Sequence, residues 1–436
     1  MIFNKTFPSV VKYMGSKTEV LDLIEEGINY LNRDYEYICD LFAGSATLSG
    51  ALRGHANVIS NDVQQYSQVF SKTYLNNYDW SKYPNCDPVC ELAADRVKRF
   101  YEAFPEYKNR FNYDRDFTVD ELNEYEEQQR SLINKNDWAG FDDYYLFTKD
   151  YSGTYWSFDQ CVWIDSYKYA IDTYKKDDAY YNLLISCLVY AMAYNSQSTG
   201  HYAQYRIPDK ESSKEDILIY RRKNITSFFR SKYAELKTFT KEENKYTFEV
   251  MAETDIKCIQ RTPNRSLIYA DPPYCFVHYS RFYHILETLV RYDYPELKYK
   301  GRYRTDRYQS EYCIRTEVAN AFTNMFSEMR DREQDMILSY SNSKTNTIDY
   351  KELVEIACEV FAKDITEEQL SGMKGKIARF LDDDTRVCKL IDTEEMNNQP
   401  YEISFLKKPY NHSRMGRTNS KTIPVTELII VAKHIH

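Results

Sequence analysis

One short turn in the chain has residue types that suit chemistry on an amino group, the sequence Asp271-Pro272-Pro273-Tyr274. It follows the apolar run 266–270, which predicts a buried strand, and open α/β sheets bind ligands where such strands end. Proline has no backbone N–H, so the Asp271 carboxylate and the Pro272 carbonyl can accept hydrogen bonds from one NH2 group. With Tyr274 stacked on the ring that carries this amine, the two acceptors would free its lone pair for methylation. Asp-Pro pairs are also common turn formers, so these residues alone leave an ordinary turn open.

A second segment, residues 37–47, predicts the turn of a nucleotide-type site. A short apolar strand leads into small residues and then into a helix that begins near Thr47. The next short strand, 58–61, ends at Asp62, about twenty residues farther on, where such folds bind ribose hydroxyls. Only Gly44 lies within the turn, and neither the lysine-bearing P-loop pattern nor the three-glycine dinucleotide turn is present. We therefore expect an adenosyl cofactor without a pyrophosphate.

Four segments of the chain resemble the Dam-like (alpha-class) adenine-specific DNA methyltransferases, namely residues 12–17, 42–46, 61–62 and 271–274. The resemblance implies S-adenosyl-L-methionine as cofactor and the N6 amine of adenine as methyl acceptor. It implies that the catalytic residues are Asp271, Pro272, Pro273 and Tyr274. The implied cofactor-binding residues are Lys12, Tyr13, Gly15, Lys17, Asp40, Phe42, Ala43, Gly44, Ser45, Thr47, Asp62 and Asp255. One departure is Ala46, where the family turn often has a second glycine, and alanine is expected to fit there only with a negative φ.

The mechanism expected for such a site is a single in-line methyl transfer. The target adenine must leave the duplex, because its amino group cannot reach a buried sulfonium while it is stacked. Asp271 and Pro272 would orient the amine while Tyr274 stacks on the base, without a metal or a covalent enzyme intermediate. Two alternatives remain open, namely methylation of RNA or of a protein amide, and a DNA-binding homologue that has lost catalysis.

The order of these segments predicts an α/β fold, a Rossmann-like methyltransferase sheet with helices on both faces and an inserted, mostly helical target-recognition domain. We expect residues 1–75 and 245–436 to form the catalytic domain and residues 76–244 to form the insertion. Further strands are predicted at 247–251, 336–342 and 427–432. The apolar run 181–192 predicts a buried helix, the spacing at 16–31 and 317–329 predicts helices on the sheet, and the acidic run 120–127 predicts a surface helix.

The chain carries a net charge of −9, so DNA binding must depend on local basic segments. Residues 298–315 hold six basic and two acidic residues with interleaved tyrosines, and residues 221–232 hold five basic residues and no acid. Such runs are often solvated faces, but the first lies close to the catalytic turn in sequence. The expected DNA-binding residues are Arg302, Arg304 and Arg307, with Arg206 at a phosphate and with Asn195 and His201 either contacting bases or bracing their loop.

Length and composition agree with a large cytoplasmic enzyme. The 436 residues are 43% hydrophobic, and no apolar stretch is long enough to suggest a secretory signal or a membrane span. The ten cysteines are scattered and are expected to be reduced thiols; the role of Cys86 and Cys90 is left open, and no metal site is expected. The expected partners are double-stranded DNA and a cognate restriction endonuclease that acts separately, with the protein a monomer or weak dimer.

Overall fold

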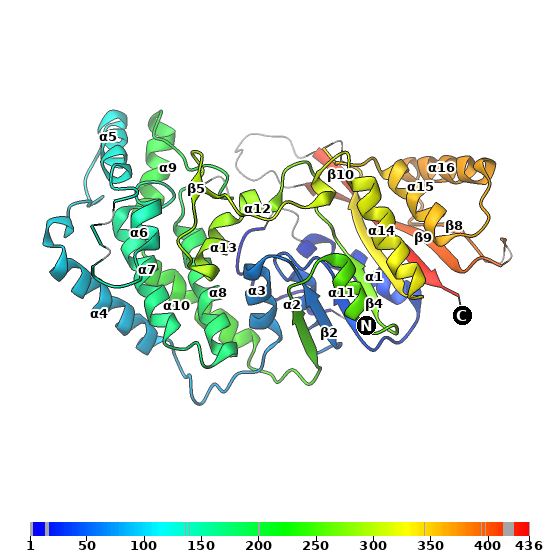
Figure 1. Ribbon diagram of the computed structural model, residues 1–436, viewed down its shortest axis with the longest axis horizontal. Helices are drawn as coiled ribbons and strands as arrows, with labels where there is room; N and C mark the ends of the chain where they lie inside the picture. The colour runs from blue at the N-terminus through cyan, green and yellow to red at the C-terminus, as the bar shows by residue number, and fades with distance from the viewer. Residues whose placement is uncertain are drawn as a thin grey trace.

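A computed structural model describes residues 3–13, 17–135, 137–138, 140–198, 201–343, 345–393, 395–396, 398–412 and 423–435. It has two parts that lie side by side, a bundle of helices and an α/β part built on a mixed sheet (Figure 1). The α/β fold class predicted from the sequence is confirmed.

The central sheet has eight strands. In spatial order they are β3 (Phe248–Met251), β2 (Val58–Asn61), β1 (Ile38–Asp40), β4 (Leu267–Ala270), β7 (Asp335–Ser341), β10 (Ile423–His434), β9 (Tyr401–His412) and β8 (Val387–Ile391). The first five are parallel, whereas β10, β9 and β8 are joined by antiparallel pairings. The three additional strands predicted from the sequence are therefore present.

Helices cover both faces of the sheet, because successive side chains of each strand point to opposite faces. On one face, Ile38, Ile337 and Ile429 pack against α1 (Leu21–Leu31) and α2 (Thr47–Leu52). The neighbouring strand residues Cys39, Leu338 and Ile430 belong to the core of the other face. The helices of that face are α11 (Asp255–Arg261), α14 (Val318–Asp331), α15 (Tyr350–Phe361) and α16 (Glu367–Asp382).

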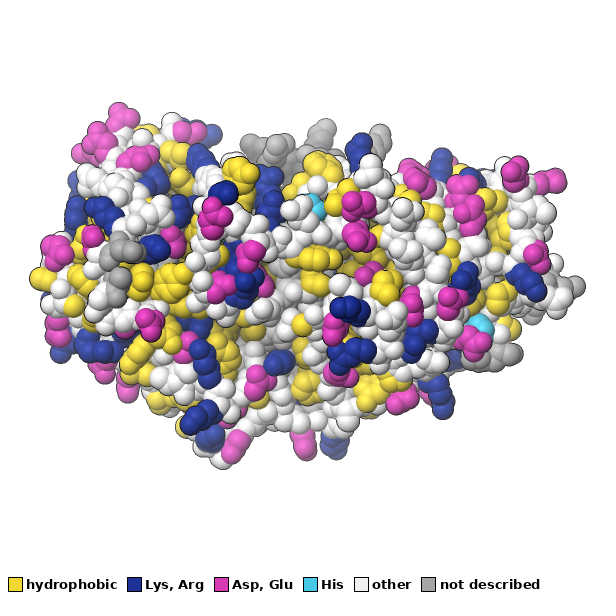
Figure 2. Space-filling model, viewed as in Figure 1, with side chains coloured by type: hydrophobic (Ala, Val, Ile, Leu, Met, Phe, Trp, Pro, Cys, Tyr) yellow, Lys and Arg dark blue, Asp and Glu magenta, His cyan; other side chains and the backbone are white. Residues whose placement is uncertain are grey.

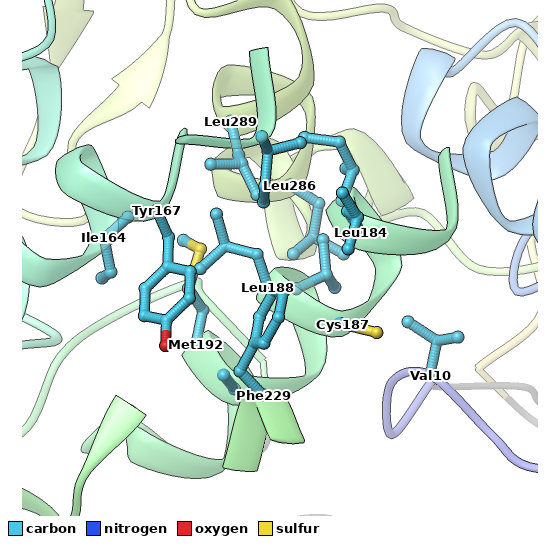
Figure 3. Packing of buried hydrophobic residues seen from close by; sticks show 14 of the residues in the cluster. Val10, Ile164, Tyr167, Leu184, Cys187, Leu188, Met192, Phe229, Leu286 and Leu289 are labelled. Atoms are coloured by element: carbon cyan, nitrogen blue, oxygen red, sulfur yellow. The ribbon is translucent and has the colours of Figure 1, made fainter. Parts of the chain in front are cut away.

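The helical part surrounds α8 (Asp178–Asn195), which is buried along most of its length as its apolar run predicts. Around it lie α3 (Gln65–Leu75), α4 (Asp87–Ala103), α5 (Val119–Arg130), α6 (Leu146–Tyr151), α7 (Phe158–Asp172), α9 (Glu211–Arg221) and α10 (Ile225–Phe239). Leu286 and Leu289 of α13 (His284–Arg291) belong to the same core as Leu184 and Leu188 (Figure 3). The helical core therefore also includes α13, which follows residues 271–274 in the sequence. The insertion bounds 76–244 stay a prediction.

Two expectations about helices need correction. The predicted helix 16–31 is a 3-10 turn, η1 (Lys17–Val20), followed by α1 from Leu21. The acidic helix α5 is not wholly a surface helix, because Glu126 is fully buried and its carboxylate accepts hydrogen bonds from Arg221 of α9. Among the described residues, no helix combines the length and the apolar character needed to cross a membrane.

Candidate active site

A pocket with an empty volume of about 1030 Å³ lies at the edge of the sheet where β1, β2 and β4 end. Parallel strands bring their carboxyl ends to one edge, so segments that are far apart in sequence meet there. The predicted residues that line it are Tyr13, Lys17, Asp40, Phe42, Ala43, Gly44, Ser45, Thr47, Asp62, Asp255, Asp271, Pro272, Pro273 and Tyr274. The catalytic turn and the glycine turn therefore face one shared cavity.

Two predicted cofactor residues do not belong to this set. Lys12 is exposed, and its ammonium lies 5.6 Å from the centre of the Tyr194 ring on α8, not in the pocket. Gly15 lies outside the described residues. A role for Lys12 in the cofactor site is therefore not supported by its position.

The glycine turn is held close to Asp62. Gly44 has φ +53°, and its N–H donates to Asp62 Oδ2 at 2.9 Å. A Cβ atom at Gly44 would lie 3.1 Å from the Tyr13 ring, so a side chain there would be strained by the backbone conformation and would crowd that ring. Ala46 also has a positive φ, +55°, which contradicts the expectation of a negative value. The turn that leads into α2 therefore imposes a strained left-handed conformation on an alanine.

Two carboxyl groups support this turn, that of the buried Asp40 and that of the half-buried Asp62. Asp62 Oδ1 accepts the Gln64 N–H at 2.8 Å, and burial raises the pKa of Asp62 to about 6. Asp40 Oδ2 accepts the Ser49 N–H at 3.3 Å and the Ser49 hydroxyl at 2.9 Å. Burial raises the pKa of Asp40 to about 7, although its bonds to Ser49 oppose the rise. Asp40 therefore holds the first turn of α2 through Ser49, whereas Asp62 links the glycine turn at Gly44 to the segment that follows β2.

Asp271, in the expected catalytic turn (residues 271–274), belongs to an ion cluster with Lys17 and Glu427. Lys17 Nζ lies 3.1 Å from Asp271 Oδ1 and 2.7 Å from Glu427 Oε1 of β10. Burial lowers the pKa of Lys17, but the two carboxylates outweigh it and raise that pKa well above its usual value. Burial raises the pKa of Asp271 to about 6, while Lys17 lowers it and Glu427 raises it. Asp271 Oδ1 is therefore held by its ion pair with Lys17, and no other partner is found for this oxygen in the described chain.

Tyr274 is packed rather than exposed. Its ring makes an edge contact with Tyr340 of β7, with centroids 6.1 Å apart, and the Lys17 ammonium lies 5.4 Å from its centre. Its carbonyl accepts the Thr347 N–H at 2.8 Å, which anchors the loop after β7 to the turn. The ring is therefore held in place beside the Asp271 carboxylate before any base binds.

Sequence reasoning missed most of the aromatic lining. It assigned stacking to Tyr274 alone, yet the pocket is also lined by Tyr66, Tyr279, Tyr308 and Tyr312. The Tyr312 hydroxyl donates to Asp255 Oδ2 at 2.5 Å, and its ring makes an edge contact with Phe42. For Tyr279, Tyr308 and Tyr312 the signal in the sequence was their place within forty residues of the turn, but tyrosine is too frequent in this chain, at 42 residues, for that to be specific. Tyr66 had no such signal.

Three of the predicted DNA-binding residues are engaged within the protein. Asn195 is fully buried, and its side-chain N–H donates to the Ala191 carbonyl at 2.6 Å. Arg304 is 1% exposed and forms paired hydrogen bonds with Asp293 and Asp306. His201 packs on the Phe282 ring, 4.6 Å between centroids, as a brace for its loop. The burial and internal hydrogen bonds of Asn195 and Arg304 therefore do not support a contact with DNA, and for Asn195 they agree with the alternative that it braces its loop.

The remaining predicted arginines lie nearer the surface. Arg302 pairs with Asp150 at 3.0 Å, Arg206 pairs with Asp216, and the Arg307 guanidinium lies 6.0 Å from the Tyr303 ring centre. On the face in Figure 2, Lys and Arg side chains are interspersed with Asp and Glu and form no single large basic patch. On this face, a DNA-binding surface would therefore consist of small local groups.

One such group surrounds the hairpin of β5 (Leu297–Lys298) and β6 (Tyr303–Arg304). An open groove with an empty volume of about 610 Å³ is lined by Arg130, Ile133, Asn134, Thr154, Tyr205, Tyr299, Lys300 and Arg302. Lys300 and Arg130 each lie 5.6 Å from the centre of the Tyr205 ring, and Tyr299 at the turn of the hairpin is 79% exposed. Cations beside aromatic faces are typical of surfaces that bind nucleic acid.

The described residues contain no cluster of three or more His, Cys, Asp or Glu side chains suited to a metal ion. Cys86 and Cys90 are buried, free thiols at the start of α4. Hydrogen bonding from Cys86 lowers the pKa of Cys90 to about 7, and the same contact raises that of Cys86. Their role stays open.

Comparison with known proteins gives a family match to residues 13–356, described as D12 class N6 adenine-specific DNA methyltransferase. Modification methylase LlaI of Lactococcus lactis subsp. lactis is 25% identical over 358 residues, 80% of this chain and 48% of the relative. Type II methyltransferase M.FokI of Planomicrobium okeanokoites is 23% identical over 76% of this chain and 44% of its own length. Type II methyltransferase M.NlaIII of Neisseria lactamica is 22% identical over 76% and 84%. The chain thus spans about half the length of the first two relatives.

Proposed function

The chain belongs to the D12 class N6 adenine-specific DNA methyltransferases, and on that premise we propose that it methylates the N6 amine of adenine at a specific site in double-stranded DNA. DNA is the substrate expected of this family. The observation that carries the proposal is the shared pocket, which is lined both by the Asp271 carboxylate and by the glycine turn at Gly44. A methyl donor at one end of this pocket and an extruded base at the other would meet beside Asp271.

The pocket suits S-adenosyl-L-methionine, the methyl donor that we propose. Its acids are Asp40, Asp62, Glu253, Asp255 and Asp271, while Lys17 is the one lysine or arginine among the described lining residues. An excess of carboxylates favours a cofactor that carries a sulfonium and an ammonium group. Asp62 would accept hydrogen bonds from the ribose hydroxyls, and Asp255 would accept one from the cofactor adenine. When bound, the cofactor supplies an electrophilic methyl group.

The protein's own contribution to methyl transfer is positioning and polarisation. The Asp271 carboxylate and the Pro272 carbonyl would each accept a hydrogen bond from one N6–H group, which makes the nitrogen lone pair less delocalised into the ring. Tyr274, held by Tyr340, would stack on the adenine and set the plane of its amine. Tyr274 is 8% exposed and the Asp271 side chain 16% exposed, so a bound base would shield the carboxylate from water. Holding the reactants in line in this way lowers the entropic part of the barrier.

For DNA binding we propose the groove at the β5–β6 hairpin rather than the predicted Arg304. Lys300 is exposed, and no acidic partner within 4.0 Å is found for it among the described residues, so its ammonium is available to a phosphate. Tyr205 and Tyr299 offer aromatic faces in the same groove. Along the chain, α12 (Tyr279–Phe282) and α13 connect residues 271–274 to this hairpin (Figure 1). DNA bound in the groove would then extend toward the pocket.

A competition assay tests this function. Purified protein is incubated with methyl-labelled S-adenosyl-L-methionine and, in separate arms, duplex DNA, structured RNA and protein acceptors. We expect label in DNA alone, lost on treatment with an exonuclease and absent with Asp271→Ala. Label in RNA or protein would favour those acceptors, and cofactor and DNA binding without transfer would favour the inactive DNA-binding homologue.

The names of the relatives suggest a biological setting. LlaI is a modification methylase, and M.FokI and M.NlaIII are type II methyltransferases. We extend to this chain a role in restriction-modification, with a cognate endonuclease that acts separately, in the cytoplasm and as a monomer or weak dimer. Determining the DNA sequence that this protein methylates would identify the cognate endonuclease, because that endonuclease should cleave the same sequence when it is unmethylated.

A further inference from the structure

Glu427 is the one member of the ion cluster that the sequence did not suggest. It lies on β10, opposite Ser341 at the end of β7, so the antiparallel direction of β10 brings it to the edge of the sheet where β4 ends. It is 1% exposed and lies beyond residues 13–356, the part of the chain that the family match covers. A buried acid at this position needs a reason, because burying an uncompensated carboxylate is costly.

The contacts of Glu427 are with the catalytic turn and its neighbours. Glu427 Oε1 accepts hydrogen bonds from Lys17 Nζ at 2.7 Å and from the Ser339 hydroxyl at 2.5 Å. Lys17 Nζ in turn lies 3.1 Å from Asp271 Oδ1, a longer contact with no directed hydrogen bond. Two carboxylates thus share one ammonium, and the better-directed bond goes to Glu427.

The sharing of the Lys17 ammonium between Asp271 and Glu427 affects how Asp271 can bind the substrate. A Lys17 that closed fully onto Asp271 would use the oxygen that must accept the amine proton of the target base. We infer that Glu427 is a positioning residue for methyl transfer, because it shares Lys17 Nζ with Asp271 and so keeps the ammonium from closing fully onto the carboxylate that must accept a hydrogen bond from the target amine. The inference rests on the proposed function, since it assigns a role within the same site.

The electrostatic surroundings define how to test it. The titratable groups with resolved interactions at Asp271 are Tyr13, Lys17, Asp40, Tyr269, Tyr274, Tyr279 and Glu427. Of these, Lys17 lowers the pKa of Asp271 and Glu427 raises it. Removing the charge of Glu427 therefore favours the ionised form of Asp271 and moves its titration to lower pH. A residue that merely filled space would not move this titration.

The variants are Glu427→Gln, which keeps an acceptor for Lys17 and Ser339 but loses the charge, and Glu427→Ala, which loses both. Glu402→Gln on β9 is the matched control, a half-buried glutamate of the same sheet whose carboxylate accepts from the Thr393 hydroxyl at 2.9 Å. Each protein is assayed for kcat, for KM of the cofactor, and for the pH dependence of kcat/KM. The titration of the Asp271 carboxyl is also followed by carbon NMR, with its signal assigned from Asp271→Asn.

We expect kcat to fall about 10- to 100-fold in Glu427→Ala and less in Glu427→Gln, because a small misplacement at the reacting centre is costly. The KM for the cofactor should stay near the wild-type value, and the acid limb of the pH profile should move to lower pH in both variants. A wild-type kcat and pH profile in Glu427→Gln and Glu427→Ala would overturn the inference, as would a lower kcat with an unmoved Asp271 titration. If Glu427→Ala does not fold, Glu427→Gln alone decides.

The NMR titration separates this inference from the proposed function. If the wild-type protein methylates no acceptor, the proposed function fails, yet the Asp271 titration still reports whether Glu427 controls that carboxyl. If the wild type is active and the titration is the same in both Glu427 variants, the inference alone fails.

Discussion

Replacing Asp271 by asparagine should stabilise the fold while it removes activity. Burial raises the pKa of Asp271 from 3.8 to about 6, so the folded protein holds the ionised carboxyl at a cost. A pKa that is higher in the folded state contributes stability that is present below pH 3.8 and is lost as pH rises through about 6. The difference corresponds to on the order of 3 kcal/mol above pH 7. Asparagine is close in shape and uncharged, so Asp271→Asn avoids this cost.

The assay is the free energy of unfolding in urea at pH 8 and at pH 5 for wild type and Asp271→Asn. We expect the variant to be more stable at pH 8, with the gain shrinking as pH falls toward 4. Asp95→Asn, at an exposed position on α4, is the control and should show no such dependence on pH. An Asp271→Asn protein that is less stable than wild type at pH 8, or whose gain does not change with pH, would refute the reasoning. Stability gained with activity lost is the usual trade-off at a functional site.

Three further predictions follow from individual residues. Ala46→Gly should raise the free energy of unfolding by about 1 kcal/mol, measured by urea denaturation, because glycine adopts φ +55° without strain; no gain would contradict the strain. Lys300→Ala should weaken duplex binding equally across sequences and reduce the slope of log K against log salt by about 1, whereas Lys98→Ala on α4 should change neither. Cofactor affinity should fall as pH drops through about 6, because Asp62 then loses its charge, and Asp62→Asn should bind more weakly with a flatter pH dependence in calorimetric titrations. An unchanged affinity in Asp62→Asn would remove that residue from the ribose site.

The parts of the site that could be predicted are those that local sequence determines. A buried strand, a small-residue turn and an acid at the end of the next strand are each visible within a few residues, as at Gly44 and Asp62. The same holds for the Asp271 turn, since strand ends meet at one edge of a parallel sheet whatever the insertion between them. These features also gave the fold class, because alternation of strands and helices constrains the sheet before any contact is known.

What could not be predicted depends on contacts between distant segments. Glu427 pairs with Lys17 across 410 residues of sequence, so no local pattern distinguishes it from an ordinary strand residue. The burial of Arg304 could not be predicted either. Its neighbours in sequence suggested a basic surface, whereas in the structure Asp293 and Asp306 pair with its buried guanidinium. Ala46 shows a third limit, because the backbone conformation of the turn outweighs the preference of the residue.

The most direct test of the central claim is to map methylated adenines by sequencing DNA from cells that express the wild-type chain or Asp271→Ala. We predict N6-methyladenine at one recurring sequence with the wild type and none above background with the variant, while the purified variant still binds the cofactor. Methylation at the wild-type level with Asp271→Ala, or no methylated adenine with the wild type, would contradict the account.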